Sequence, residues 1–191
     1  MPFALSLKSV NATADAIMSL WDQVSAFEDF PSMRALNYPP HITLAIYDAP
    51  GASEQLAIAT LAKAARGQAA IELCFGRIRT FDGPPLILWA DPEPKTALRE
   101  IHDQIHAAID PGLCHPHYRP GSWVPHCTLA MRTRPDRNQD ALAFAGAFSE
   151  SLRIVFDVMD CVRLAPLQVV AEARLAHKDP KKHGNGGTTC A

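Results

Sequence analysis

The sequence predicts a mixed fold of strands and helices that is built twice, as two lobes related by pseudo-twofold symmetry. Three observations predict this duplication. A five-residue motif occurs twice, as HITLA at His41–Ala45 and as HCTLA at His126–Ala130. A proline precedes each copy. The elements expected around the two copies also follow in the same order (strand, helix, motif strand, helix, strand) at an offset of 81 to 85 residues.

The elements of the first half are predicted from the spacing of its apolar residues. Alternation predicts strands, and apolar residues three or four apart, such as Ile17, Leu20 and Val24, predict helices. Asn11 is a suitable N-cap for the first helix, and Gly67 is a natural residue just after the second. The expected elements are a strand at Phe3–Lys8, a helix from Asn11 to about Phe27, a strand at His41–Tyr47, a helix at Ser53–Ala65 and a strand at Ile71–Phe81.

The second half repeats this order and ends with two strands. The expected elements are a strand at Leu86–Ala90, a helix at Pro94–Ile109, a loop at Asp110–Pro125, a strand at His126–Met131, a helix at Asp136–Phe148, and strands at Leu152–Val162 and Leu167–Leu175. Residues after about His177 lack apolar anchors. We therefore expect one domain over residues 1–177, made of two interleaved lobes with one motif each, and a flexible C-terminal tail over residues 178–191.

The composition is that of an ordinary globular protein. The chain has 191 residues, 48% of them hydrophobic and 20% charged, which is enough for a substantial core. Its formal net charge of −2 argues against the broad basic surface that long nucleic acids require, and favours a small or terminal nucleotide in a local pocket. No Cys-x-x-Cys pair indicates a zinc ribbon, and no apolar stretch approaches the roughly 18 residues that span a bilayer. We expect a cytoplasmic monomer without a membrane partner.

In each motif, the histidine and the threonine share one face of a strand. Side chains two residues apart on a strand point to the same side. His41 and Thr43 therefore face one way, and the apolar residues of the motif face the core. His126 and Thr128 are arranged alike. If the two lobes are related by a twofold axis, the two faces meet across it, so the repeat predicts one site made of two halves.

Two facing histidines suit acid–base catalysis at phosphorus. The ordinary pKa of histidine, about 6.5, keeps both protonation states accessible near neutral pH. One imidazole would take a proton from the attacking water or hydroxyl, and the other would protonate the leaving oxygen. The threonine hydroxyls would donate hydrogen bonds to the phosphoryl oxygens, and no metal or cofactor is required. A lone histidine on a strand is more often structural, and threonine is a common strand residue, but the matched pair favours catalysis.

At these residues the sequence resembles the two-histidine phosphoesterases, the family of the bacterial and archaeal 2′-5′ RNA ligases and RNA 2′,3′-cyclic phosphodiesterases. The family signature is a pair of His-Φ-Ser/Thr-Φ tetrapeptides, where Φ is apolar. Both copies match it, with Cys127 as a small Φ residue. The resemblance extends over nearly the whole chain, from about Phe3 to Leu175.

The resemblance implies a bilobal α+β fold, with two antiparallel sheets lining a central cleft and helices outside. It also implies metal-independent opening of a 2′,3′-cyclic phosphate of a nucleotide or RNA end, usually to a 2′-phosphate. The catalytic set that it implies is His41, Thr43, His126 and Thr128. A 2′-5′ RNA ligase or 2′-5′ phosphodiesterase is the alternative activity, and a non-catalytic RNA- or nucleotide-binding domain on the same fold is the alternative class.

Residues just before the two motifs are candidates for substrate binding. Tyr38 precedes the first motif, and Arg119 and Trp123 precede the second in a loop rich in proline and histidine. Arg119 would reach a phosphate, and Tyr118 or Trp123 would stack on a base. The alternative interpretation is an ordinary surface loop.

Two further patterns admit both a functional and a structural interpretation. His102 and His106 are one helical turn apart, which is a metal-ligand spacing, but a zinc protease would need glutamate where Asp103 stands. The alternative for the two histidines is a solvated helix face. Arg77 and Arg79 alternate on a predicted strand, where they either line the cleft or lie on a solvated face.

Overall fold

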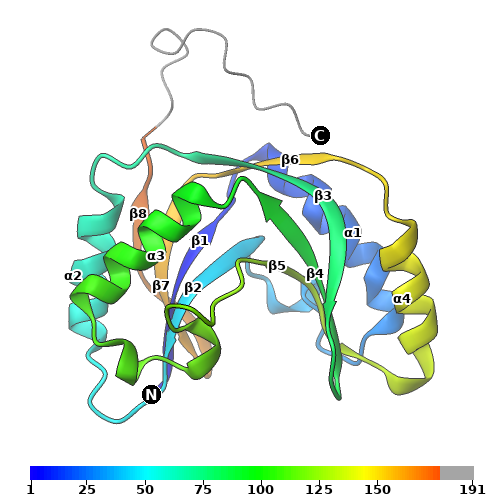
Figure 1. Cartoon of the computed structure of the whole chain (residues 1–191), viewed down its shortest axis with the longest axis horizontal. Helices are drawn as coiled ribbons and strands as arrows, with labels where there is room; N and C mark the ends of the chain where they lie inside the picture. Colours follow the sequence, from blue (N-terminus) through cyan, green and yellow to red (C-terminus); the bar gives the residue numbers. More distant parts are fainter. Residues whose placement is uncertain (177–191) are drawn as a thin grey trace, which may run out of the picture.

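The computed structural model describes residues 1–176, which form an α+β fold, as the sequence predicts (Figure 1). The helices are α1 (Asp15–Val24), α2 (Glu54–Ala65), α3 (Thr96–Ala108) and α4 (Asn138–Ala147). The strands are β1 (Phe3–Lys8), β2 (His41–Tyr47), β3 (Ile71–Phe81), β4 (Leu86–Glu93), β5 (Cys127–Thr133), β6 (Leu152–Phe156), β7 (Val158–Leu164) and β8 (Leu167–Arg174). The tail predicted at residues 178–191 lies outside the described residues.

Most elements begin and end close to their predicted bounds, and β1, β2 and β3 match them at both ends. Ser53 caps α2, because its hydroxyl accepts a hydrogen bond from the backbone N–H of Leu56. The first helix starts as a 3₁₀ turn capped by Asn11 and becomes α-helical at Asp15. Local capping chemistry therefore explains where these helices start.

One predicted strand is divided in two. The alternation over residues 152–162 predicts a single strand, whereas the structure separates β6 from β7 at Asp157. The backbone N–H of Asp157 donates to the carbonyl oxygen of Lys8 (3.1 Å), and its carboxylate accepts from the backbone N–H of Val10 (2.9 Å). These two hydrogen bonds join Asp157, at the break, to the end of β1. The two parts of the segment, β6 and β7, pair with different strands.

The strands form one antiparallel sheet in the order β6-β3-β4-β5-β2-β1-β7-β8. In its centre β2 pairs with β5 through one residue of each strand, Ile42 and Cys127. The two expected sheets are therefore two four-stranded halves of a single sheet. Figure 1 shows this sheet curled into an arch, with the motif strands β2 and β5 side by side in its middle.

The duplication appears in the sheet as an exchange of third strands between the two repeats. The third strand of the first repeat is β3, and that of the second repeat is the segment that contains β6 and β7. The first part of β3 pairs with β6, and its second part pairs with β4. The segment that contains β6 and β7 has the same arrangement, since β6 pairs with β3 and β7 pairs with β1. The last strand of each repeat therefore completes the half of the sheet that holds the other repeat's first strand.

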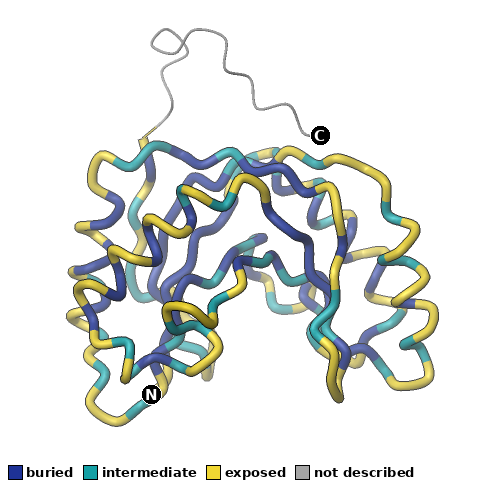
Figure 2. Tube along the Cα trace, viewed as in Figure 1, coloured by how far each residue is buried: buried dark blue, intermediate teal, exposed yellow. Residues whose placement is uncertain are grey.

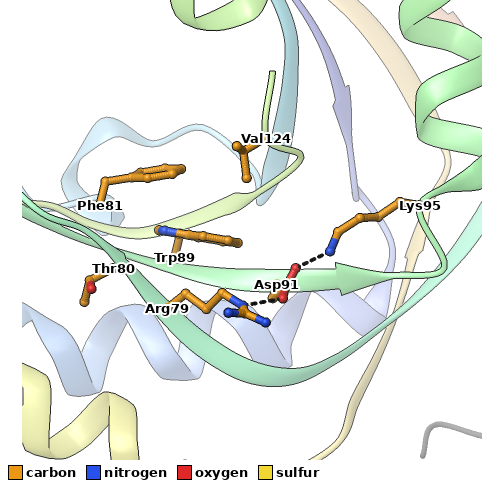
Figure 3. A pocket seen from close by; sticks show the side chains of 7 residues that line it. All are labelled: Arg79, Thr80, Phe81, Trp89, Asp91, Lys95 and Val124. Carbon is orange, nitrogen blue, oxygen red and sulfur yellow. Dashed lines mark hydrogen bonds and ion pairs between the residues drawn. The ribbon is translucent and has the colours of Figure 1, made fainter. Parts of the chain in front are cut away.

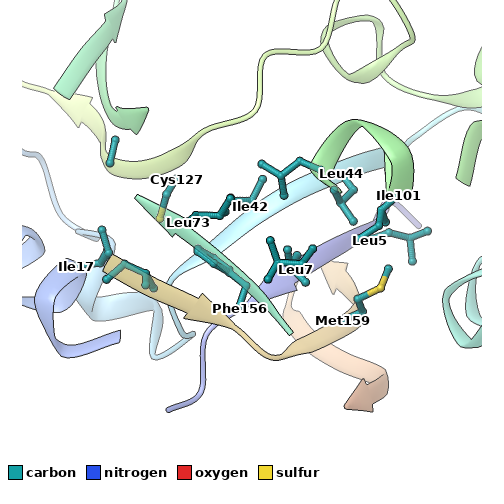
Figure 4. Packing of buried hydrophobic residues seen from close by; sticks show 14 of the residues in the cluster. Leu5, Leu7, Ile17, Ile42, Leu44, Leu73, Ile101, Cys127, Phe156 and Met159 are labelled. Carbon is teal, nitrogen blue, oxygen red and sulfur yellow. The ribbon is translucent and has the colours of Figure 1, made fainter. Parts of the chain in front are cut away.

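The helices cover the apolar face of this sheet. α1 and α4 contact β5, β3 and β4 on one half, and α2 and α3 contact β7, β8, β1 and β2 on the other. Leu5, Leu7, Ile42 and Phe156 are among the fully buried side chains of the core that this packing creates (Figure 4). Figure 2 shows buried residues along the strands and exposed ones on the outer turns of the helices. The face turned away from the helices is left for the polar residues of the motifs.

No helix in the part of the chain that the structure describes has the length and apolar character needed to cross a membrane.

Candidate active site

The two motifs meet in the centre of the sheet, where Ile42 pairs with Cys127. Both of these apolar side chains are fully buried, as are the leucines two residues further along each strand. The histidine and threonine of each motif alternate with them and are half-buried. The alternation predicted from the sequence is therefore present, with the polar residues on the face that the helices leave uncovered.

Antiparallel pairing sets the four polar side chains in a diagonal arrangement. One residue to either side of the central pair, His41 lies opposite Thr128 and Thr43 lies opposite His126. Residues that face one another across two strands have their side chains on the same side of the sheet. Each histidine thus has the other motif's threonine as its neighbour.

Both histidines are anchored through the same nitrogen. His41 Nδ1 lies 2.9 Å from the carbonyl oxygen of Pro39, and His126 Nδ1 lies 2.7 Å from that of Val124. A carbonyl oxygen can only accept a hydrogen bond, so each Nδ1 carries a proton and donates it. In the neutral form of each ring, Nε2 therefore carries the free lone pair. The site holds two matched groups that can take or give a proton at Nε2.

Burial lowers the pKa of both histidines below the ordinary value. The pKa of His41 falls to about 4, because the positive charges of His126 and Lys8 add to the effect of burial and the bond to Pro39 offsets it only in part. Burial also lowers the pKa of His126, against the opposing effect of its bond to Val124. Both imidazoles are mainly neutral at pH 7 in the free protein.

Two tryptophans support the threonines through the backbone. The indole N–H of Trp21 on α1 donates to the carbonyl oxygen of Thr128 (2.9 Å), and that of Trp123 donates to the carbonyl oxygen of Thr43 (3.0 Å). One face of the Trp123 ring, a candidate for base stacking, is covered by His102, with centroids 4.2 Å apart and planes 2° apart. Trp123 therefore contacts β2 through its indole N–H and α3 through one face of its ring.

Tyr38 lies beneath His41 and is not exposed on the surface. Its ring meets the ring of His41 edge-to-face at 4.7 Å, and only 7% of the residue is exposed. Its hydroxyl donates to the carboxylate of Asp160 (2.8 Å), which also pairs with Lys8 Nζ (2.9 Å), and Lys8 in turn contacts Glu172. The predicted substrate residue thus belongs to a buried polar cluster that supports His41.

Arg119 shapes the loop before the second motif. Its Nε donates to the carbonyl oxygen of Cys114 (2.8 Å), and its Nη2 donates to that of Gly112 (3.1 Å). The guanidinium predicted to reach a phosphate thus uses these donors on the carbonyl groups of its own loop.

The interpretation of His102 and His106 as a solvated helix face is wrong. They are 3% and 8% exposed, because this face of α3 packs against the loop before β5. Both Nε2 atoms bond to the carbonyl oxygen of Tyr118, at 2.9 and 3.0 Å. Among the described residues, no three His, Cys, Asp or Glu side chains are grouped so that they could hold a metal ion.

A pocket beside His126 was missed by the sequence reasoning, apart from Arg79. It has a volume of about 530 Å³. The side chains that line it, shown in Figure 3, are those of Arg79, Thr80, Phe81, Trp89, Asp91, Lys95 and Val124. Arg77 does not line this pocket and is exposed. Trp89 lies opposite Thr128 in the sheet, so strand alternation puts it on the face that carries the motifs. Alternation along β4 is visible in the sequence, but only the pairing of β4 with β5 shows that Trp89 lies on the face that carries the motifs.

This fold and its paired motifs are those of a two-histidine phosphoesterase. The chain belongs to the 2′-5′ RNA ligase superfamily, whose family model matches residues 16–164. The resemblance noted from the motifs is thereby confirmed.

Solved structures share the fold but little sequence. TT0787 of Thermus thermophilus is 19% identical, with a TM-score of 0.63 over 94% of this chain and 100% of that one. E. coli LigT complexed with 3′-AMP is 16% identical, with a TM-score of 0.57 over 92% and 99%. A phosphoesterase is 14% identical, with a TM-score of 0.56 over 92% and 98%. No curated protein matches the sequence. At these identities the likeness establishes the fold.

Proposed function

We propose that the protein is a metal-independent phosphodiesterase that opens 2′,3′-cyclic phosphates of nucleotides or RNA ends to 2′-phosphates. The observation that carries the proposal is the pair of histidines, each anchored at Nδ1 by a carbonyl oxygen, on one face of two adjoining strands. Membership of the 2′-5′ RNA ligase superfamily supports phosphodiester chemistry at this place in the fold.

In this mechanism His41, His126, Thr43 and Thr128 form the catalytic set. The Nε2 atom of one neutral histidine removes a proton from water as its oxygen bonds to phosphorus. The Nε2–H of the other, protonated histidine gives its proton to the ribose oxygen as the bond from that oxygen to phosphorus breaks. Each proton transfer accelerates the reaction by roughly 10²- to 10⁴-fold. The threonine hydroxyls stabilise the charge that develops on the non-bridging oxygens.

The substrate is a small nucleotide or a terminal one. The chain has a net charge of −2, which disfavours a long polyanion spread over its surface. E. coli LigT, which has the same fold, has been solved in complexes with 3′-AMP, ATP and NADP+. Those ligands are of the size that one local pocket holds. We keep the expectation of a cytoplasmic monomer as part of the proposal.

A 2′-5′ RNA ligase or 2′-5′ phosphodiesterase is the second candidate, because the matching family model is that of the 2′-5′ RNA ligase superfamily. The same proton transfers serve both directions of the reaction, because the acid of one direction is the base of the other. A non-catalytic nucleotide-binding domain is the third, and it would bind a cyclic nucleotide without product.

The test is a substrate panel with matched histidine variants. The wild-type protein is expected to convert nucleoside 2′,3′-cyclic phosphates to 2′-phosphates, with no loss of rate in EDTA. His41→Ala and His126→Ala are each expected to lower kcat by roughly 10²- to 10⁴-fold. His117→Ala, which changes an exposed histidine outside the site, is the control.

Three outcomes would decide between the candidates. Full activity in the double variant His41→Ala, His126→Ala would contradict the mechanism. Turnover restricted to 2′-5′ dinucleotides or joined RNA ends would select the second candidate. Saturable binding of a cyclic nucleotide with no product would select the third.

A further inference from the structure

The pocket beside His126 contains a stacked pair of aromatic rings. The rings of Phe81 and Trp89 lie with centroids 4.9 Å apart and planes 21° apart. They come from β3 and β4, which pair as an antiparallel hairpin at one side of the arch (Figure 1). Such a stack offers an aromatic surface on which a further flat ring can lie.

Each charged side chain that lines the pocket takes part in an ion pair. Asp91, which is 6% exposed, accepts from Arg79 Nε (2.6 Å) and pairs with Lys95 Nζ (2.7 Å). Lys95 also pairs with Glu93 (2.8 Å). Glu93 is not among the lining residues, but with it each positive side chain of the pocket has a carboxylate partner, so neither cation is left unpaired to attract a second phosphate. The pocket therefore fits a neutral aromatic ring, with polar groups at one edge to bond to it.

Both rings of the stack touch the ring of His126. The centroid of Phe81 lies 5.1 Å from that of His126, and the centroid of Trp89 lies 6.0 Å from it, both edge-to-face. Val124, whose carbonyl oxygen anchors His126 Nδ1, lines the same pocket. The pocket thus opens directly beside one of the two proton-transfer groups.

The corresponding position beside His41 is filled by the protein itself. Tyr38 lies edge-on against the His41 ring, and Lys8 lies opposite His41 on β1. Lys8 is 3% exposed and Asp160 is not exposed at all. In the described part of the chain, the two halves of the site therefore differ: one is closed by a buried polar cluster, and the other opens into an aromatic pocket.

We propose that the pocket binds the nucleobase of the substrate, which makes the enzyme selective for nucleoside 2′,3′-cyclic phosphates over cyclic phosphates of base-free sugars. This inference rests on the proposed function and adds the part of the substrate that is recognised. The base extends the stack of Phe81 and Trp89, the edge of the base meets Arg79 and Asp91, and the ribose lies beside His126.

The test compares two substrates in two proteins. The substrates are adenosine 2′,3′-cyclic phosphate and methyl β-ribofuranoside 2,3-cyclic phosphate, which lacks the base. The ratio of their kcat/KM values measures what the base contributes. Phe81→Leu is expected to lower this ratio about 5- to 100-fold, the range of one base–aromatic stack. Any effect of the variant on the shared chemical step cancels in the ratio.

Phe144→Leu is the matched control, because Phe144 is also a half-buried ring with an aromatic neighbour, Phe27 at 5.8 Å, and does not line the pocket. It should leave the ratio at the wild-type value. A Phe81→Leu variant with the wild-type ratio, or a wild-type protein that prefers the base-free substrate, would overturn the base assignment while leaving the phosphodiesterase proposal intact.

A binding measurement covers the case in which neither substrate is turned over. The indole N–H resonance of Trp89 is expected to move on addition of adenosine 2′-phosphate and not on addition of inorganic phosphate. Trp89→Phe identifies that resonance among those of Trp21 and Trp123. A response confined to the other two tryptophans, or an equal response to inorganic phosphate, would show that the base does not bind in this pocket.

Discussion

His41 and His126 share one kind of anchor but have different neighbours. His41 is flanked by Lys8 across the strands and by the ring of Tyr38, whereas His126 is flanked by two aromatic rings and the open pocket. A positive charge beside His41 favours its neutral form, which is the form that accepts a proton. The two halves of the site are equivalent in backbone geometry and unequal in chemistry.

This inequality predicts which histidine is the acid. In an in-line displacement the water attacks from the side of phosphorus opposite the leaving ribose oxygen. If the base occupies the pocket, the ribose lies beside His126. His126 would then protonate the leaving oxygen, and His41 would activate the water.

A substrate in which sulfur replaces the leaving oxygen tests this assignment, because a thiolate departs without needing a proton. The rate of His126→Ala on this substrate is expected to recover to within about tenfold of the wild-type rate, and that of His41→Ala is expected to stay low. Recovery of His41→Ala in place of His126→Ala would reverse the two roles.

At the scale of elements, the site depends on groups that hold its two strands from outside. β2 and β5 pair through one residue each, so their ladder alone fixes them weakly. The indole N–H of Trp21, from α1, and that of Trp123, from the loop before β5, bond to the threonine carbonyl oxygens of the two motifs. These bonds join each motif strand to a neighbouring element.

Replacing either tryptophan by phenylalanine removes the donor and keeps a ring. Trp123→Phe and Trp21→Phe are each expected to lower the free energy of unfolding by about 1–3 kcal/mol, because a buried carbonyl loses its partner and the smaller ring packs less well. Urea unfolding measures the loss. Tyr47→Phe is the control, because the buried Tyr47 hydroxyl has no hydrogen-bond partner among the described residues. Equal losses in all three variants would argue against the role of the indole bonds.

Much of the order of helices and strands can be predicted from local sequence pattern, whereas the tertiary contacts between them cannot. Alternation placed β2 and β3 and the polar face of each motif, because it depends only on residues two apart. The burial of His102 and His106 depends on the carbonyl oxygen of Tyr118, which lies in a loop that no local pattern docks onto α3. The pocket beside His126 depends likewise on the pairing of β3, β4 and β5.

At the scale of the whole molecule, buried histidines tie stability to pH. Burial lowers the pKa of His102 and lowers that of His106 to about 4. Between about pH 6.5 and pH 4 the unfolded chain therefore binds more protons than the folded one, and the free energy of unfolding falls as the pH falls. Each such histidine contributes a slope of at most about 1.4 kcal/mol per pH unit.

Urea unfolding at pH 7 and pH 5 measures this dependence. His106→Leu is expected to reduce the difference between the two values, and the Tyr118 carbonyl oxygen keeps His102 as its donor in that variant. His117→Gln, at an exposed position, should leave the difference unchanged. A difference that is the same in His106→Leu as in the wild type would contradict the assignment.

The exchange of third strands has a consequence for a protein half this length. A single repeat folded alone would leave one edge of its half-sheet without the strand that completes it. Two such chains would satisfy each other by trading that strand, as a domain-swapped homodimer with one motif from each subunit at the interface. Joining them in tandem removes the dependence on concentration. It also frees the two copies to diverge, so that one half can close around a lysine and a tyrosine while the other opens into a pocket.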